Sequence, residues 1–325
     1  MTKIRIGIYG YGNIGKGVEL AILNNSDLEL VGIFSRRENI RTLNSITIQA
    51  SKVKEYKEKI DVLILCGGSK KDLPLLSPEL LKDFNTIDSF DTHALIPEYF
   101  NKLDKIGKEA KTLGLISVGW DPGILSMARV LFESILPRGK NYTFWGKGIS
   151  QGHSDAIRKI AGVLDARQYT IPKLDVLRSI KEGSAKELTS QEMHLRECFV
   201  VLENDTKEER KRVEEEIKTM PNYFLGYDVI VHFISQEELN LNHNKLPHAG
   251  CVIRSAKTTD ENNHLLELSL TLDSNPEFTG SIMVAYAQAL HRMHQEGVTG
   301  AITVFDIPLS KLSNLSNEEL RKKML

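Results

Sequence analysis

The chain has 325 residues, of which 41% are hydrophobic, and a formal net charge of −1. This length suffices for two domains with cores of their own, and the balanced charge, without a basic tail or stripe, argues against a general nucleic-acid binder. No apolar run reaches the ~20 residues of a membrane span, and no signal-peptide pattern precedes the first strand, so we expect a cytoplasmic protein without membrane association. The three cysteines are far apart, which suits reduced thiols.

The N-terminal segment has the pattern of a strand, a glycine turn and a helix. An apolar run at residues 4–9 leads into Gly10-Tyr11-Gly12-Asn13-Ile14-Gly15, and a helix-periodic pattern follows. Gly10 permits the tight turn, Gly12 lets the backbone approach a pyrophosphate, and Gly15 lets helix and strand pack closely. Since a helix N-terminus offers N–H groups to an anion, the motif predicts a dinucleotide site, with a purely structural glycine turn as the alternative.

The end of the second expected strand, residues 28–34, indicates which dinucleotide binds. An NAD-binding fold usually places an acidic residue there, ~20 residues after the glycine motif, on the ribose 2′-hydroxyl. This chain has Ser35-Arg36-Arg37 instead. Guanidinium groups can grip a 2′-phosphate that no carboxylate repels, so the sequence predicts NADP rather than NAD. The alternative is that one of the arginines is simply solvated.

Strands and helices alternate through the first third of the chain. Further strands are expected at residues 61–66, 85–89 and 113–118, with helices at 77–83 and 97–111. This alternation is typical of a doubly wound, Rossmann-type parallel sheet, in which ligands bind beyond the carboxyl ends of the strands. The residues expected to contact the cofactor there are Gly10, Tyr11, Gly12, Asn13, Ile14, Ser35, Arg36, Arg37, Cys66, Gly67, Gly68, Ser69, Ser89, Phe90, Asp91, Val118, Gly119, Trp120, Asp121 and Pro122.

The pattern changes after residue 122. A helix expected at 124–136 leads into extended segments with a period near two, which predict a second, α+β domain built on a largely antiparallel sheet. These segments are 142–145, 197–201, 227–233, 250–254 and 265–272, and helices are expected at 205–218, with a solvated charged face, and at 281–296. We therefore expect a dinucleotide-binding domain at 1–121, a substrate-binding and dimerisation domain at 122–297, and a segment at about 298–325 that packs back on the first domain.

Five unusual motifs follow: Thr143-Phe144-Trp145-Gly146, Gln151-Gly152-His153-Ser154-Asp155, Thr219-Met220-Pro221-Asn222-Tyr223-Phe224, Leu246-Pro247-His248-Ala249-Gly250 and Asp273-Ser274-Asn275-Pro276-Glu277-Phe278-Thr279. With the glycine motif and Ile33-Phe34-Ser35-Arg36-Arg37, they closely resemble the meso-diaminopimelate D-dehydrogenases of bacterial lysine biosynthesis over nearly the whole chain. The resemblance implies NADP-dependent oxidative deamination of the D-centre of meso-2,6-diaminopimelate to L-2-amino-6-oxopimelate and ammonia, and the reverse reductive amination. It also implies a homodimer.

The resemblance further implies roles for individual residues. Its substrate contacts are Asp91, Asp121, Trp145, Thr170, Arg196, His248 and Asn275. Asp91 and Asp121 would pair with the D-centre ammonium and take part in catalysis, whereas Arg196, with Thr170 and His248, would hold the distal L-centre. Local alternatives are a turn at Asp121, a helix cap at Asp91 and a surface charge at Arg196.

His153 is a candidate for proton handling, because the unperturbed pKa of histidine lies near neutrality. The alternative is a structural hydrogen bond, and the identity of the general base stays open. No metal site is expected. Two other functions also stay open: a related NADP-dependent dehydrogenase or reductase acting on another amino or keto acid, and a non-catalytic NADPH-sensing protein that uses its second domain for interaction.

Overall fold

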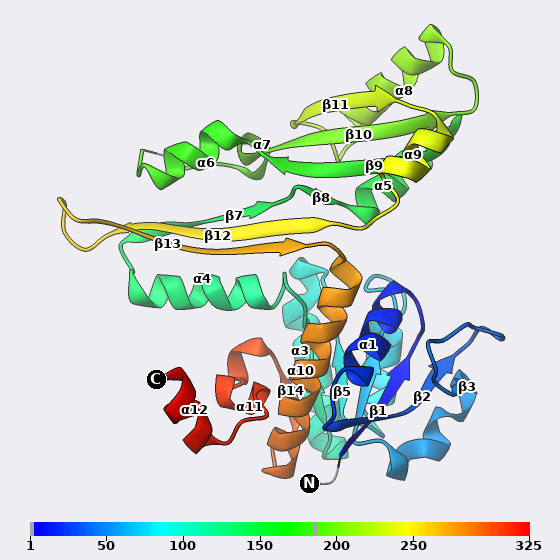
Figure 1. Cartoon of the computed structure of the whole chain (residues 1–325), viewed down its shortest axis with the longest axis vertical. Helices are drawn as coiled ribbons and strands as arrows, with labels where there is room; N and C mark the ends of the chain where they lie inside the picture. The colour runs from blue at the N-terminus through cyan, green and yellow to red at the C-terminus, as the bar shows by residue number, and fades with distance from the viewer. Residues whose placement is uncertain (1–2, 185–186) are drawn as a thin grey trace. The chain divides into compact units, whose positions relative to one another are not determined.

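The computed structural model describes residues 3–184 and 187–325, and the chain forms two compact units. The first unit extends to Met127 and resumes from Pro276 to Leu325, and the second comprises Ala128–Asn275. Figure 1 shows the helices and strands that build them. Within the described ranges, no helix is long and apolar enough to cross a membrane.

The first unit is built on a seven-stranded sheet in the order β14-β6-β5-β4-β1-β2-β3, and every neighbouring pair is parallel. Its strands are β1 (Ile4–Tyr9), β2 (Leu28–Ser35), β3 (Thr47–Gln49), β4 (Val62–Leu65), β5 (Thr86–Asp88), β6 (Leu113–Leu115) and β14 (Gly300–Ile302). Parallel strands need crossover connections, which here contain α1 (Asn13–Leu23), the 3-10 helix η1 (Ala50–Lys59), α2 (Leu73–Leu80), the 3-10 helix η2 (His93–Leu95) and α3 (Ile96–Ala110). The expected doubly wound parallel sheet is confirmed.

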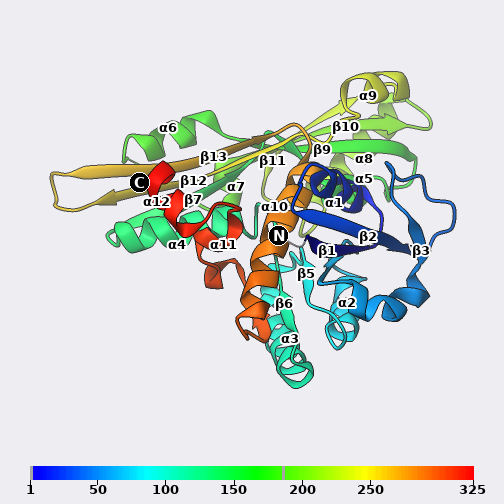
Figure 2. The same cartoon turned by 60° about the horizontal axis from the view of Figure 1, so that its bottom comes forward.

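The C-terminal part of the chain belongs to this first unit. Helix α10 (Asn275–Gln295) lies beside α1 (Figure 2), and a Cβ at Gly280 would come within 2.5 Å of the Gly17 carbonyl carbon. The sequence pattern predicts that residues up to 297 belong to the second domain, whereas in the structure α10 packs in the first unit from Pro276 onward. An amphipathic pattern does not show which core a helix covers, and the close contact between glycines has no signature in the sequence. The 3-10 helix η3 (Val304–Asp306) and helices α11 (Leu309–Leu312) and α12 (Asn317–Met324) follow β14.

The second unit contains two sheets, with the strand orders β11-β10-β9-β8 and β13-β12-β7. The strands are β7 (Gly139–Trp145), β8 (Gly148–Ile149), β9 (Val163–Pro172), β10 (His194–Leu202), β11 (Asp228–Phe233), β12 (His248–Lys257) and β13 (Asn263–Leu272). All their ladders are antiparallel except the one between β10 and β11. The expectation of a largely antiparallel second domain is confirmed, although two sheets replace the single one expected.

Strand β9 was not predicted, because its inward-facing positions include polar side chains. Ala166, Gln168 and Thr170 are buried there, so the strand lacks the alternation of apolar and polar residues that identifies a half-buried strand. The helices of this unit are α4 (Ile124–Ile135, shared with the first unit), α5 (Gln151–Ile157), α6 (Leu174–Lys181), α7 (Ser190–Met193), α8 (Lys207–Thr219) and α9 (Gln236–Asn242). Val213 and Ile217 of α8 pack into the core of the four-stranded sheet, and the rest of that helix is mostly exposed, as expected.

Candidate active site

The turn after β1 leaves the N-terminus of α1 open. Gly10 has a φ of +94°, a left-handed conformation that favours glycine, and a Cβ at Gly15 would lie 2.5 Å from the Gly10 carbonyl oxygen. A Cβ at Gly12 would meet no atom within 4 Å, so the backbone there faces open space. No side chain caps α1, and the N–H groups of its first residues, including Asn13 and Ile14, stay available to an anion. A dinucleotide pyrophosphate therefore fits this turn.

Two arginines follow β2, and their surroundings differ. Arg36 Nη2 lies 2.9 Å from Asp72 Oδ1, while the other carboxylate oxygen of Asp72 accepts the N–H of Gly68 at 2.9 Å. Arg37 instead donates from Nη2 to the carbonyl oxygen of Tyr11 in the glycine turn. Both arginine side chains are exposed. The structure thus ties Arg36 to the loop after β4 and directs Arg37 to the turn that would hold the dinucleotide.

A buried carboxylate joins the loops that follow β5 and β6. Asp88 is 1% exposed and accepts hydrogen bonds from the hydroxyls of Ser77 at 2.9 Å and Tyr99 at 2.6 Å. It also accepts the backbone N–H groups of Phe90 at 3.0 Å and Ser117 at 3.3 Å. Burial raises the pKa of Asp88, and the four hydrogen bonds oppose that rise. Asp88 therefore fixes the beginnings of the loops that carry Asp91 and Asp121.

The two aspartates expected to act on the substrate lie in these loops. Asp91 is exposed, and its backbone N–H donates to Ser69 Oγ at 2.9 Å, which connects the loops after β4 and β5. Asp121 is partly buried in a tight turn closed by a bridge between Trp120 and Gly123. The turn that the sequence offers as an alternative role for Asp121 is thus present, and it constrains the backbone from which the Asp121 carboxylate extends.

Several of the residues expected to contact the cofactor have buried side chains. These residues are Cys66, Phe90, Val118 and Trp120. Phe90 stacks on Tyr99 with ring centroids 4.2 Å apart, and burial raises the pKa of the Cys66 thiol to about 12. Because these side chains are part of the core, the four residues would contact a cofactor mainly through their backbone atoms.

In the second unit, Thr170 on β9 lies directly opposite Arg196 on β10, and Arg196 Nη1 donates to Thr170 Oγ1. The guanidinium carbon of Arg196 lies 4.3 Å from the ring centroid of Tyr227. The Nε atom of Arg196 is buried and has no hydrogen-bond partner in the protein. A buried donor without an acceptor costs about 1–3 kcal/mol, so this guanidinium is suited to an anionic ligand such as a carboxylate.

His248 lies close to this pair. A Cβ at Gly148 would come within 2.5 Å of the His248 ring, and Gly148 pairs with Thr170 across β8 and β9. The N–H of Asn275 donates to the carbonyl of Leu246, two residues before His248, at 3.1 Å. The structure thus brings Thr170, Arg196 and His248 together, with the backbone of Asn275 attached to the segment that enters β12.

Trp145 is held at the end of β7 by a buried histidine. Its backbone N–H donates to His194 Nε2 at 3.0 Å, and His194 Nδ1 lies 3.0 Å from the carbonyl oxygen of Ser190. The two contacts require an imidazole that accepts at Nε2 and donates from Nδ1. Burial lowers the pKa of His194 to about 4, so the ring is neutral at pH 7.

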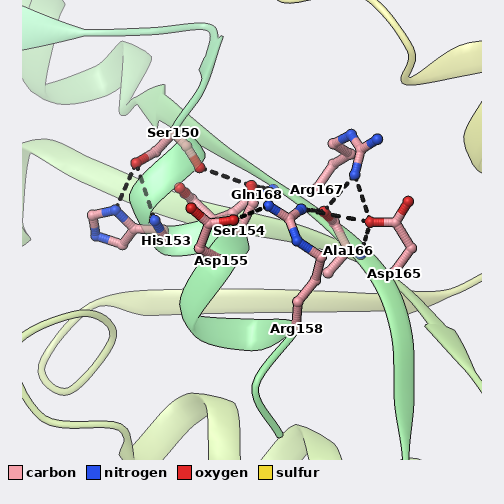
Figure 3. Close-up of polar contacts among 9 residues, drawn as sticks. All are labelled: Ser150, His153, Ser154, Asp155, Arg158, Asp165, Ala166, Arg167 and Gln168. Atoms are coloured by element: carbon pink, nitrogen blue, oxygen red, sulfur yellow. Dashed lines mark hydrogen bonds and ion pairs between the residues drawn. The ribbon is translucent and has the colours of Figure 1, made fainter. Parts of the chain in front are cut away.

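His153 lies on α5, where Ser150 caps the helix (Figure 3). Ser150 Oγ lies 2.7 Å from His153 Nδ1 and accepts the His153 backbone N–H at 3.4 Å. The rings of Tyr223 and Phe224 meet the imidazole edge-on. Burial, and to a lesser degree the charge of Arg196, lower the pKa of His153 to about 4. Such an imidazole is a weak base, so the geometry favours a hydrogen-bonding role over proton transfer, and proton handling by His153 stays a prediction.

Comparisons with known proteins show which family the chain belongs to. The family model described as diaminopimelic acid dehydrogenase C-terminal domain matches residues 119–274. The meso-diaminopimelate D-dehydrogenase of Ureibacillus thermosphaericus is 53% identical over 333 residues, which cover 100% of both chains. The chain belongs to the meso-diaminopimelate D-dehydrogenase family.

Solved structures of related enzymes share the fold of this dehydrogenase. A C. glutamicum DAP dehydrogenase in complex with DAP is 40% identical, with a TM-score of 0.92 and 100% of both chains covered. An engineered D-amino acid dehydrogenase bound to NADP+ is 38% identical, with a TM-score of 0.87 and the same coverage. The family resemblance of the sequence motifs is confirmed, and the chain is an oxidoreductase.

Three further residues that no sequence motif indicates support the expected site of this dehydrogenase. Asp88, His194 and Tyr227 each contact one of its members or its loops. Their signal in the sequence is weak, because a buried polar side chain is recognised only once its partners are known. In the part of the chain that the structure describes, no three His, Cys, Asp or Glu side chains gather so as to hold a metal ion.

Proposed function

We propose that this dehydrogenase catalyses the NADP-dependent oxidative deamination of the D-centre of meso-2,6-diaminopimelate to L-2-amino-6-oxopimelate and ammonia, and the reverse reductive amination. One structural observation carries the proposal: Arg196, beside Thr170, has a buried Nε that lacks an acceptor. A substrate with a second amino-acid group supplies a distal carboxylate for this guanidinium, whereas a simple amino or keto acid does not.

The first unit would hold the cofactor. The turn from Gly10 to Gly12 and the N-terminus of α1 would bind the pyrophosphate, and Arg37, with Arg36, would bind the 2′-phosphate. Bound NADP supplies the acceptor for the hydride of the reacting carbon. The loops after β4, β5 and β6 would contact its nicotinamide half, because ligands of such sheets bind beyond the carboxyl ends of the strands.

The substrate's two ends have the same connectivity and differ only in handedness, so the protein must select the D-centre by orientation. Asp91 and Asp121 would pair with the D-centre ammonium and orient the reacting carbon. Arg196, Thr170 and His248 would bind the distal L-centre, with Trp145 and Asn275 as further contacts. Loss of the hydride leaves an imine at the D-centre, and water would add to its carbon to give a carbinolamine. Its C–N bond would then break as the carbonyl forms, which releases ammonia, and Asp91 or Asp121 would take the proton of the water and return one to the leaving nitrogen.

A homodimer and a cytoplasmic location belong to the same proposal. On α4 the apolar side chains of Val130, Leu131 and Ile135 are exposed, and a partner subunit would cover such a surface. The oligomeric state can be measured by light scattering, in which a monomer would contradict this part of the proposal.

The deciding experiment compares initial rates of nicotinamide reduction with NADP+ or NAD+ against the meso, LL and DD isomers of diaminopimelate. We expect rapid turnover of the meso isomer with NADP+ and little with the LL isomer. Turnover of other D-amino acids at comparable kcat/KM would favour a related dehydrogenase of different specificity. Binding of NADPH without turnover of any isomer would leave an NADPH-sensing protein.

A further inference from the structure

A carboxylate that the proposed reaction does not use is buried on α1. Glu19 is 0% exposed and accepts hydrogen bonds from the hydroxyl of Tyr11 and from the N–H groups of Leu43 at 3.2 Å and Asn44 at 3.4 Å. The hydroxyl of Ser45 also contacts it. Burial raises the pKa of Glu19, but these hydrogen bonds outweigh burial and hold the pKa below its ordinary value. Glu19 is therefore an anion inside the unit.

The donors to Glu19 lie in two loops at one edge of the site. Tyr11 belongs to the glycine turn after β1, and Leu43 to Ser45 belong to the segment between β2 and β3. The carboxylate of Glu19, on α1, thus binds both loops.

Tyr11 contacts both Glu19 and Arg37. Its hydroxyl is bound to Glu19, and its carbonyl oxygen accepts a hydrogen bond from Arg37 Nη2. The backbone N–H of Arg37 also donates to Ser35 Oγ at 3.0 Å. Arg36 instead pairs with Asp72 at 2.9 Å, in the loop after β4. Two hydrogen bonds, one at the side-chain hydroxyl of Tyr11 and one at its backbone carbonyl, thus connect the buried carboxylate of Glu19 to the exposed guanidinium of Arg37 through the covalent structure of Tyr11.

We propose that Glu19 is a positioning residue that orients Arg37 toward the 2′-phosphate of NADP, and so sets the preference for NADP over NAD. The inference rests on the proposed cofactor. An exposed arginine loses side-chain freedom when it binds a phosphate, and a guanidinium that is already oriented loses less. NAD lacks the phosphate, so its binding gains nothing from this orientation.

The test is isothermal titration calorimetry of the wild-type protein and Glu19→Gln with NADP+ and, separately, with NAD+. Glutamine has the size of glutamate, but its amide nitrogen cannot accept a hydrogen bond, so the donors around Glu19 lose one of two acceptor atoms. We expect the Kd for NADP+ to rise about 10-fold and the Kd for NAD+ to change less than about twofold.

A double variant separates positioning from general destabilisation. In an Arg37→Ala background no guanidinium remains to be oriented, so Glu19→Gln should leave the Kd for NADP+ unchanged. Asp61→Asn is the matched control. Asp61 accepts the N–H of Arg5 at 2.8 Å and pairs with its guanidinium, but it lies before β4, at the amino end of the sheet. This variant should lower Tm without changing the ratio of the two Kd values.

Tyr11→Phe keeps the test decisive if Glu19→Gln does not fold, because it removes only the hydroxyl that Glu19 binds. It should shift the ratio of Kd values in the same direction. If Glu19→Gln and Tyr11→Phe keep the wild-type ratio of Kd values, the inference about Glu19 is wrong and the proposed cofactor stands. The same conclusion follows if Glu19→Gln raises the Kd for NADP+ equally with and without Arg37. A wild-type protein that binds both dinucleotides equally would refute the proposed cofactor and the inference with it.

Discussion

Replacing Arg196 with leucine should raise the KM for the substrate while leaving the stability of the fold almost unchanged. The change removes a cation whose Nη1 binds Thr170, whose carbon lies 4.3 Å from the Tyr227 ring, and whose buried Nε lacks an acceptor in the protein. If the side chain serves to bind a ligand carboxylate, leucine should weaken that ligand greatly and the fold little.

The magnitudes follow from the contacts. A hydrogen bond to a charged group contributes about 1.5–3 kcal/mol, which corresponds to a rise in KM for meso-diaminopimelate of about 10- to 150-fold. For the fold, the lost bond to Thr170 and the lost contact with Tyr227 cost about 2–4 kcal/mol together. Removal of the unpaired Nε returns about 1–3 kcal/mol. The two changes largely offset each other and leave a loss of about 1 kcal/mol, so Tm should fall by only a few degrees.

The assay combines steady-state kinetics, titration with NADP+ and thermal unfolding of Arg196→Leu. The Kd for NADP+ should stay at the wild-type value. Arg167→Leu is the matched control, because Arg167 lies on β9 and pairs with Asp165 at 2.6 Å rather than with an incomplete site. An unchanged KM would show that the distal carboxylate binds elsewhere, and a fall in Tm of many degrees would show that Arg196 has a structural role.

Three further predictions concern the rest of the site. Asp121→Asn should lower kcat at least about 10-fold with an unchanged circular dichroism spectrum; wild-type turnover would leave Asp121 a turn residue. Arg37→Ala should raise the Kd for NADP+ more than Arg36→Ala, because Asp72 already pairs with Arg36; equal losses would contradict this. His194 has a folded pKa of about 4, below its unfolded value, so the unfolded chain binds more protons as pH falls from about 6.5 to 4. His194 alone should therefore lower the free energy of unfolding by up to about 1.4 kcal/mol per pH unit there, in addition to the effect of His153, and His194→Asn should reduce the slope by that amount in urea titrations.

The first unit could be predicted from the sequence because its signals are local. The apolar runs of β1 and β2 and the glycines at 10, 12 and 15 specify strand, turn and helix within a few residues of one another. The sequence could not show to which unit α10 belongs, because the packing of Gly280 against Gly17 joins positions far apart in the chain. Strand β9 was missed for a related reason, since Gln168 and Thr170 are polar and buried.

The candidate site shows the same division. Arg36, Arg37 and the glycine turn follow directly from motifs, and the resemblance led to Thr170, Arg196 and His248, which the structure brings together. The supporting residues Glu19, Asp88 and His194 carry no motif. Each is a polar side chain whose burial is acceptable only because donors or acceptors from other segments meet it. Their function can be recognised only in the folded chain.

The position of β14 has a consequence for how the protein is made. This strand occupies the edge beside β6, and a Cβ at Gly107 on α3 would lie 2.5 Å from the carbonyl oxygen of Gly300. A ribosome must therefore synthesise the chain through residue 302 before the N-terminal unit can acquire its last strand. Until then β6 is an unpaired edge, and a nascent or truncated chain that ends near residue 127 exposes it to pairing with other molecules. Translation to near the C-terminus is thus a condition for a protected nucleotide-binding sheet.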